Sequence, residues 1–234
     1  MRIILKISGE ALKGDYNISE ENLEKIYKDI IDIKENNELI IVVGGGNFWR
    51  GRNKLDINNI ISDQIGMLGT VMNALAITSY LNQKGISSSC YSAFEVLGII
   101  KKSNMDDVNK DFKDGKVIVL GGGLGVPNLS TDMTTVSKGI EYGADLILMS
   151  KNIDAIYDKD PKEEDAKKIS ELSHEELLKM SLNQGVSSLT VLDLEALVEL
   201  VKHKIPLYVY NSGSITNIKE VLEGKSGTRV ITKN

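Results

Sequence analysis

Short apolar runs separated by amphipathic segments form the main pattern of this chain. The runs cover residues 3–7, 39–43, 117–120, 146–149 and 207–210 and consist mainly of Ile, Leu and Val. Runs of this length without polar alternation are typical of parallel strands that are buried on both faces. The pattern therefore predicts a sheet built from these strands, with a short closing strand at 228–231.

The segments between the runs carry helical periodicity. Residues 20–36 place apolar side chains on one face, and Ser19 stands where an N-cap is expected. In residues 61–83 the apolar positions recur at steps of four, three, four and three. Gly66 and Gly69 interrupt this second helix at a cost of about 1 kcal/mol each relative to alanine. This indicates close approach of a neighbouring helix or a ligand, whereas simple tight packing is the more ordinary explanation for either glycine alone.

Further helices are predicted at 173–182, 191–204 and 215–223. Strands that alternate with helices along the whole chain indicate an α/β fold, a three-layer α/β/α sandwich with a mainly parallel central sheet. We find no internal repeat, low-complexity tract or interdomain linker. We therefore expect residues 1–234 to form a single domain.

Composition excludes several classes of protein. The formal net charge of −5 disfavours a nucleic-acid-binding surface, which needs a basic excess. The single cysteine, Cys90, permits neither an intrachain disulfide nor a cysteine metal site. No secretory signal or apolar run of about 20 residues is recognised, so a cytoplasmic protein without a membrane span is expected. His174 and His203 lie in helical stretches far from the motifs below, and we interpret both as structural.

Three strand-to-glycine turns recur, LKISGEAL at 5–12, IIVVGGGNFWRG at 40–51 and VIVLGGGLGVP at 117–127. Carboxyl ends of parallel strands share one sheet edge, and glycine-rich turns there present backbone N–H groups to anions. Each element alone has an ordinary explanation, since Lys6 could be a surface lysine, Arg50 a salt-bridge partner and a lone GGG a tight turn. Their joint order, with Lys6, Arg50 and Arg52 as local positive charges, instead predicts a cavity for more than one phosphate group.

The segment STDMTTV at 130–136 starts a helix shortly after the third glycine turn. An isolated STD is an ordinary capping signal, but here Thr131 and Asp132 would lie beside the same cavity. Phosphoryl transfer depends mainly on positioning and charge neutralisation, which Lys6 and the glycine amides can supply. No histidine lies near the motifs, which favours a phosphate or carboxylate acceptor over an alcohol whose proton must be removed.

Taken together, these motifs resemble the amino acid kinase superfamily, and most closely its bacterial uridylate (UMP) kinases. LKISGEAL, GGGNFWRG, SDQIGMLGTVMNALA, GLGVPNLSTD and KNIDAIYDKDP occur in that family's order and approximate spacing, over nearly the full chain. The resemblance implies transfer of the γ-phosphoryl group of ATP to UMP, with Mg²⁺ carried mainly by the nucleotide phosphates and no metal ligand from the protein.

The resemblance also implies roles for individual residues. Lys6 and Asp132 would be catalytic, the aspartate orienting the lysine or the metal. The residues on the ATP side would be Lys6, Ile7, Ser8, Gly9, Gly46, Arg50, Lys151, Tyr157 and Asp160. The residues on the UMP side would be Gly45, Asp63, Leu124, Gly125, Val126, Pro127, Asn128, Leu129, Ser130 and Thr131. Asp63 would contact the ribose hydroxyls, the N-terminal part would mainly hold UMP, and the C-terminal part would mainly hold ATP.

Two departures from the family pattern stand out. Leu124, Gly125, Val126 and Pro127 replace the usual TGNP, which removes a threonine hydroxyl and an asparagine amide from the UMP loop. Bacterial members are commonly hexamers activated by GTP, but residues 78–82 and 98–116 contain none of the arginines or the histidine found there. We therefore expect a homo-oligomer, a hexamer by resemblance, without GTP activation.

Two other hypotheses stay open at this point. One is a superfamily kinase acting on carbamate or an acylated amino acid, against which Asp63 favours a nucleotide. The other is a nonenzymatic nucleotide or oxyanion-binding protein, against which the presence of both Lys6 and Asp132 argues.

Overall fold

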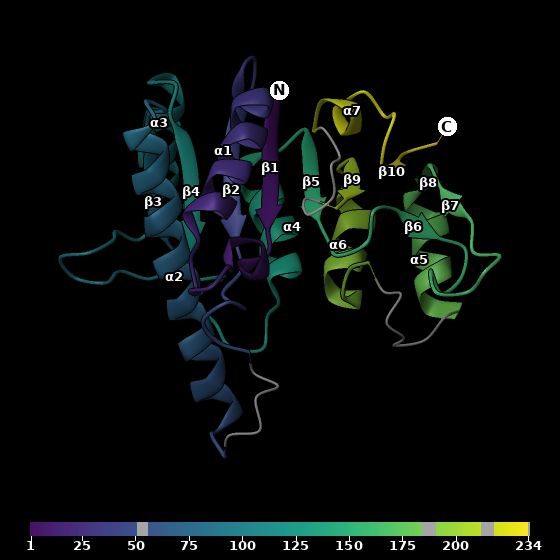
Figure 1. Cartoon of the computed structure of the whole chain (residues 1–234), viewed down its shortest axis with the longest axis horizontal. Helices are drawn as coiled ribbons and strands as arrows, with labels where there is room; N and C mark the ends of the chain where they lie inside the picture. Colours follow the sequence, from purple (N-terminus) through teal and green to yellow (C-terminus); the bar gives the residue numbers. More distant parts are fainter. Residues whose placement is uncertain (51–55, 184–190, 212–217, 234) are drawn as a thin grey trace.

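The computed structural model describes residues 1–50, 56–183, 191–211 and 218–233. Its centre is an eight-stranded sheet with the strand order β3-β4-β2-β1-β5-β9-β10-β8 (Figure 1). The strands are β1 (Arg2–Ile7), β2 (Glu38–Val43), β3 (Ser88–Ser92), β4 (Val117–Gly121), β5 (Leu146–Ser150), β8 (Glu171–Ser173), β9 (Leu207–Tyr210) and β10 (Thr228–Ile231). All neighbouring pairs are parallel except β9 and β10, which are antiparallel.

Helices cover both faces of this sheet. The helices are α1 (Glu20–Lys34), α2 (Asn59–Gln83), α3 (Met105–Lys113), α4 (Thr131–Tyr142), α5 (His174–Asn183), α6 (Leu194–His203) and α7 (Ile218–Leu222), with a short 3₁₀ helix η1 (Gly9–Leu12) after β1. One layer contains α1, α2 and α7, and the other contains α3, α4, α5 and α6. The arrangement confirms the predicted three-layer α/β/α sandwich.

The core explains why the apolar runs lack polar alternation. In β1, Ile3 and Leu5 pack under α1 and α2, whereas Ile4 packs under the opposite layer. Its neighbour β2 is in register, with Ile4 opposite Ile40. Both faces of each central strand are covered, so alternate side chains pack against opposite helical layers and apolar residues can follow one another along the strand.

Several elements lie outside the sequence predictions. The edge strand β3, of sequence SSCYS, has too few apolar residues to stand out. Helix α3 is short and mostly charged, although Asn104 caps it by accepting a hydrogen bond from the N–H of Asp107 at 2.9 Å. A small hairpin of β6 (Ile156–Tyr157) and β7 (Lys168–Ile169) was also missed. The predicted Ser19 N-cap precedes α1, but its side chain makes no capping hydrogen bond.

Helix α2 departs from the expectation that the chain lacks a membrane-length apolar segment. It has 25 residues, and its most apolar window reaches a mean hydropathy of 1.4. By length and composition alone it could therefore cross a membrane. In the fold, however, one face packs on the sheet through Ala74, Ile77 and Leu81, and Asn73 and Thr70 are also buried. The apolar side chains on its other face remain uncovered in the single chain.

Candidate active site

The three glycine turns meet at the carboxyl edge of the sheet. The N–H of Gly44 donates to the carbonyl of Ile7 at 2.9 Å, which joins the second turn to the first. A Cβ atom built on Gly9 would lie 2.6 Å from the backbone N of Gly46, so only glycine permits this contact. The N–H of Gly122 donates to the hydroxyl of Thr70 on α2 at 2.6 Å. The predicted convergence of the turns is confirmed.

Backbone donors at this meeting point are available for a ligand. Among the residues that the structure describes, the N–H groups of Gly45 and Gly46 make no hydrogen bond. Both residues line a cavity, and an unbonded N–H group beside a cavity is a ready anion donor. The second glycine turn can therefore hold phosphate oxygens.

The two glycines inside α2 are explained by this convergence. A Cβ atom on Gly69 would lie 3.2 Å from Cβ of Phe48 and 3.4 Å from the carbonyl oxygen of Gly45. The carbonyl oxygen of Gly66 would lie 2.5 Å from a Cβ atom on Gly45. Close approach is thus found as predicted, but the element that approaches the helix is the second glycine turn rather than a neighbouring helix.

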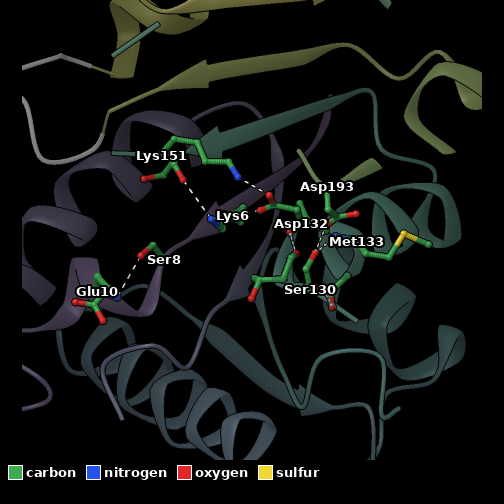
Figure 2. Close-up of polar contacts among 12 residues, drawn as sticks. Lys6, Ser8, Glu10, Ser130, Asp132, Met133, Lys151 and Asp193 are labelled. Carbon is green, nitrogen blue, oxygen red and sulfur yellow. Dashed lines mark hydrogen bonds and ion pairs between the residues drawn. The ribbon is translucent and has the colours of Figure 1, made fainter. Parts of the chain in front are cut away.

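Two lysines and one carboxylate form the charged centre of the site (Figure 2). Nζ of Lys6, at the end of β1, lies 3.4 Å from Oδ1 of Asp132 and 3.4 Å from the carbonyl oxygen of Ser150. The other carboxylate oxygen of Asp132 binds Nζ of Lys151, just beyond β5. The Lys6 and Asp132 side chains are only 10% and 14% exposed, so their charges are weakly screened.

The surroundings of Lys6 lower the pKa of its ammonium below the ordinary value. Burial is the largest cause, because it disfavours the charged form. The nearby Lys151 lowers the pKa further, whereas Asp132 opposes both effects. Lys6 is therefore a cation with few compensating charges, which an incoming phosphate would stabilise.

The first turn of α4 places Asp132 in this centre. The hydroxyl oxygen of Ser130 accepts a hydrogen bond from the N–H of Met133 at 2.9 Å and caps the helix. Ser130 also donates to Asp193, which in turn caps α6 by accepting from the N–H of Ala196 at 2.8 Å. The predicted helix start at Thr131 and Asp132 is confirmed, and its positive dipole end faces the glycine turns.

A cavity of about 230 Å³ opens beside this charged centre. Its described lining residues are Val43, Gly45, Gly46, Trp49, Ser62, Asp63, Gly66, Met67, Thr70, Gly123, Val126, Asn128, Leu129, Ser130, Thr131 and Thr134. Most residues predicted for the UMP side are among them. Leu124, Gly125 and Pro127 are not. In this part of the loop Gly123 and Gly125 adopt positive φ, and Gly125 lies close to Ala93.

Asp63 and the loop before α4 close this cavity from opposite sides. The backbone N–H of Asn128 donates to Oδ2 of Asp63 at 2.7 Å. Asn128 has a φ of 64°, a left-handed conformation that asparagine tolerates better than most residues. Asp63 and the Leu124–Thr131 loop, which were both expected on the UMP side, are thus in direct contact.

Sequence reasoning missed the part of the lining that comes from the α2 side. The indole N–H of Trp49 donates to the hydroxyl of Ser62 at 2.8 Å, across the rim of the cavity. Met67, Thr70 and Thr134 also line it. Trp49 and Ser62 both lie inside motifs quoted above. The motifs alone do not show that these two side chains meet at the cavity.

The residues predicted for the ATP side do not all lie at the charged centre. Arg50 is 59% exposed and pairs with Glu10, at 2.7 Å from Nη2 to Oε1. Tyr157 and Asp160 line a separate cavity of about 190 Å³ beside the β6–β7 hairpin. Arg52 lies outside the described residues. The structure thus brings Lys6 and Lys151 to the charged centre, places Gly9 against the second glycine turn, and leaves the hairpin residues as a separate group.

Comparison with known proteins agrees with this geometry. Residues 1–211 match the Amino acid kinase family. The chain belongs to this family. Among the relatives of this family member, the uridylate kinase of Pediococcus pentosaceus is 36% identical over 98% of this chain and 95% of its own. The uridylate kinase of Aster yellows witches'-broom phytoplasma is 35% identical over 99% and 97%.

Solved structures of the amino acid kinase fold superpose closely on this chain. The UMP kinase from Ureaplasma parvum has a TM-score of 0.87 at 28% identity and covers 99% of this chain and 98% of its own. The UMP kinase from Bacillus anthracis has a TM-score of 0.90 at 26% identity, with coverage of 100% and 96%. The central sheet and its helical layers are therefore those of the family.

Proposed function

We propose that this protein is a UMP kinase, which transfers the γ-phosphoryl group of ATP to UMP in the cytoplasm and yields UDP and ADP for pyrimidine nucleotide biosynthesis. The observation that carries the proposal is the position of the Asp63–Asn128 cavity beside the Lys6–Asp132–Lys151 centre. Uridylate kinases with more than a third of their residues identical over nearly the whole length support the same reaction.

In this proposal Lys6 stabilises the charge that spreads over the transferred phosphoryl oxygens. Its ammonium is buried, and the loss of hydration lowers its pKa. A phosphate anion beside it would stabilise the charged form again. Asp132 holds the ammonium in place at 3.4 Å. The Gly45 and Gly46 N–H groups would bind the phosphates that flank the transferred group.

The acceptor phosphate needs no protein base. The second pKa of a phosphate monoester is near 6, so the attacking oxygen is already largely ionised at neutral pH. The part of the chain that the structure describes has no histidine on the cavity wall, and His174 is buried in α5 with Nε2 2.9 Å from the carbonyl oxygen of Ile205. This arrangement suits a phosphate acceptor better than an alcohol.

Mg²⁺ would enter with the nucleotide. Within the described residues, no three acidic, histidine or cysteine side chains gather to hold a metal ion, and Asp132 is already bound by two lysines. Mg²⁺ commonly binds through substrate phosphates and water with one or two carboxylates. These residues therefore fit an ion carried by the ATP phosphates, where it would neutralise charge.

The proposal is tested by a coupled ADP-release assay with ATP and Mg²⁺. UMP, CMP, dUMP, carbamate and N-acetylglutamate are offered separately, each with and without GTP. Turnover with UMP well above all other acceptors is expected, with no stimulation by GTP. Turnover with carbamate or N-acetylglutamate instead would reassign the acceptor, and ATP binding without any turnover would favour the nonenzymatic alternative.

We also propose that a second copy of this chain covers the outer face of α2. Ile61, Leu68 and Met72 follow one another at helical spacing along this face and are 44–48% exposed. A row of large exposed apolar side chains, on a helix whose most apolar window has a mean hydropathy of 1.4, is unfavourable in water. The resemblance to hexameric kinases suggests that three such pairs assemble further.

This assembly is tested by sedimentation and light scattering. Leu68→Glu should reduce the particle mass, because it places a charge in the middle of the row. Val198→Glu is the matched control, since Val198 is a 46% exposed side chain on α6, in the opposite layer. A monomeric wild-type protein, or equal masses for both variants, would contradict the proposal.

A further inference from the structure

A pair of buried asparagines joins the glycine turns to helix α2. Nδ2 of Asn47 donates to Oδ1 of Asn73 at 2.8 Å, and Nδ2 of Asn73 donates back to Oδ1 of Asn47 at 2.7 Å. Asn73 is 0% exposed and Asn47 5% exposed. The two amides therefore form a closed ring of hydrogen bonds inside the protein.

Each amide also donates to a backbone carbonyl outside the pair. Asn73 bonds the carbonyl oxygen of Gly44 at 2.7 Å, and Asn47 bonds that of Asn17 at 2.7 Å. All four amide hydrogens are thus used. A Cβ atom on Gly9 would lie 2.6 Å from Oδ1 of Asn47, so the pair also touches the first glycine turn.

The bond to Gly44 has a direct consequence for the phosphate-binding backbone. The carbonyl of Gly44 and the N–H of Gly45 belong to one planar trans peptide, so they point in opposite directions. When Asn73 holds that carbonyl, it fixes the direction of the Gly45 N–H. Gly45 lines the acceptor cavity, and its N–H makes no hydrogen bond within the described residues.

Glycine turns need such support more than other turns. Glycine loses more conformational freedom on ordering than any other residue, so three in a row would rotate readily without an outside contact. Asn73 lies ten residues along α2 from Asp63, the residue that closes the acceptor cavity. One rigid helix therefore carries both an acceptor contact and the group that orients the amides next to it.

We propose that Asn73, together with Asn47, is a positioning residue for phosphoryl transfer, which fixes the Gly44–Gly45 peptide so that its N–H faces the phosphate. This inference rests on the proposed kinase reaction. The asparagines do not touch the reacting atoms. They set the direction of a donor, and a misplacement of about 1 Å at such a site can cost 100-fold in rate.

The test is Asn73→Asp, a change of nearly equal size that alters only the donors. An ionised carboxylate cannot donate to the carbonyl of Gly44, and it would face that oxygen and Oδ1 of Asn47. Burial and these oxygens raise the pKa of the introduced carboxyl, whereas its protonated form can still donate one hydrogen bond. In the described residues no charged side chain bonds either amide, so the wild-type protein lacks this titration.

The kcat of Asn73→Asp for UMP should fall at least tenfold at pH 8 and recover as the pH is lowered toward 6. The KM values for UMP and ATP should change by less than about threefold. Asn82→Asp is the matched control, because Asn82 lies at the far end of α2 and binds the backbone N–H of Ser88 at 2.9 Å. Asn82→Asp should lower the melting temperature but should leave the pH dependence of kcat as in the wild-type protein.

Asn73→Ser provides a second test without any new charge, in case the first variant does not fold. Its shorter hydroxyl cannot reach both partners, so kcat should fall at least fivefold with an unchanged pH profile. The inference is overturned if Asn73→Ser keeps kcat within twofold of the wild-type value. It is also overturned if Asn73→Asp shows the same kcat and the same pH dependence as Asn82→Asp. Wild-type protein without UMP turnover would overturn the proposed reaction itself.

Discussion

The carboxylate of Asp132 lies 3.4 Å from the ammonium of Lys6, at the point where the first strand and the start of α4 meet. The two residues are 126 positions apart, and the contact exists only because β1 and α4 are neighbours in the fold. The same carboxylate holds Lys151. One anion therefore serves two cations, so net positive charge remains for phosphates.

Replacement of Lys6 by alanine should lower kcat by about 100- to 1,000-fold, because one buried charge-stabilising group is worth roughly 3–4 kcal/mol in such sites. ATP binding, measured by calorimetry, should persist, since the glycine amides remain. Lys202→Ala on the exposed side of α6 is the control, and its kcat should stay unchanged. Wild-type turnover in the Lys6 variant would remove this lysine from the mechanism.

The pH dependence of kcat should show an alkaline limb below the ordinary lysine value of 10.5. The reason is that burial lowers the pKa of Lys6 and only its protonated form stabilises the transferred group. Asp132→Asn removes the anion that raises this pKa, so the limb should move to lower pH. A series of kcat values from pH 7 to 10 measures it, and a shift to higher pH would contradict this assignment.

Substitution of Asp63 by asparagine should raise the KM for UMP about tenfold or more and leave the KM for ATP nearly unchanged. The asparagine oxygen can still accept the hydrogen bond from Asn128, so the loop should stay closed, while the charge that we expect to hold the ribose hydroxyls is lost. Asp106→Asn in the first turn of α3 is the control. Equal effects on both substrates would mean that the acceptor and donor sides are misassigned.

Replacement of Asp29 by asparagine should stabilise the protein more at pH 8 than at pH 5. Burial, with Asp32 as a second cause, raises the pKa of the Asp29 carboxyl from 3.8 to about 7. Between these values the folded protein holds a proton that the unfolded chain has lost, so stability falls as the pH rises through this window.

The Asp29→Asn substitution should therefore add about 1–2 kcal/mol to the free energy of unfolding at pH 8. This gain is smaller than the pKa difference alone would give, because solvent screens part of the effect. Urea unfolding at the two pH values measures it. Asp56→Asn, at an exposed position, should change neither value. A gain that is the same at pH 5 and pH 8 would show that the charge of Asp29 is not the cause.

The sequence predicted the central strands and the meeting of the glycine turns because both depend on local patterns. Apolar runs identify buried parallel strands, and parallel strands bring their carboxyl ends to one edge. The same logic failed for β3, which begins at Ser88, ends at Ser92 and pairs with β4 at the edge of the sheet. Such a strand needs little apolar sequence.

The α2 side of the site could not be predicted, because it depends on which turn of the helix meets which loop. The pattern of α2 identifies a packed helix, but only the fold shows that Thr70 accepts from Gly122 and that Asn73 bonds Gly44. The assignment of Leu124 and Pro127 to the UMP side rests on their position in a motif. It stays a prediction, although neither residue is part of the cavity wall.

Trp49 is the single tryptophan of the chain, and its indole forms part of the wall of the acceptor cavity. Its N–H is held by Ser62 at the rim, next to Asp63. Indole emission responds to polarity and to neighbouring charge, so a nucleotide that enters this cavity should change the fluorescence of the unlabelled protein. Acceptor binding can thus be followed optically in the absence of ATP, apart from catalysis and in every variant described above.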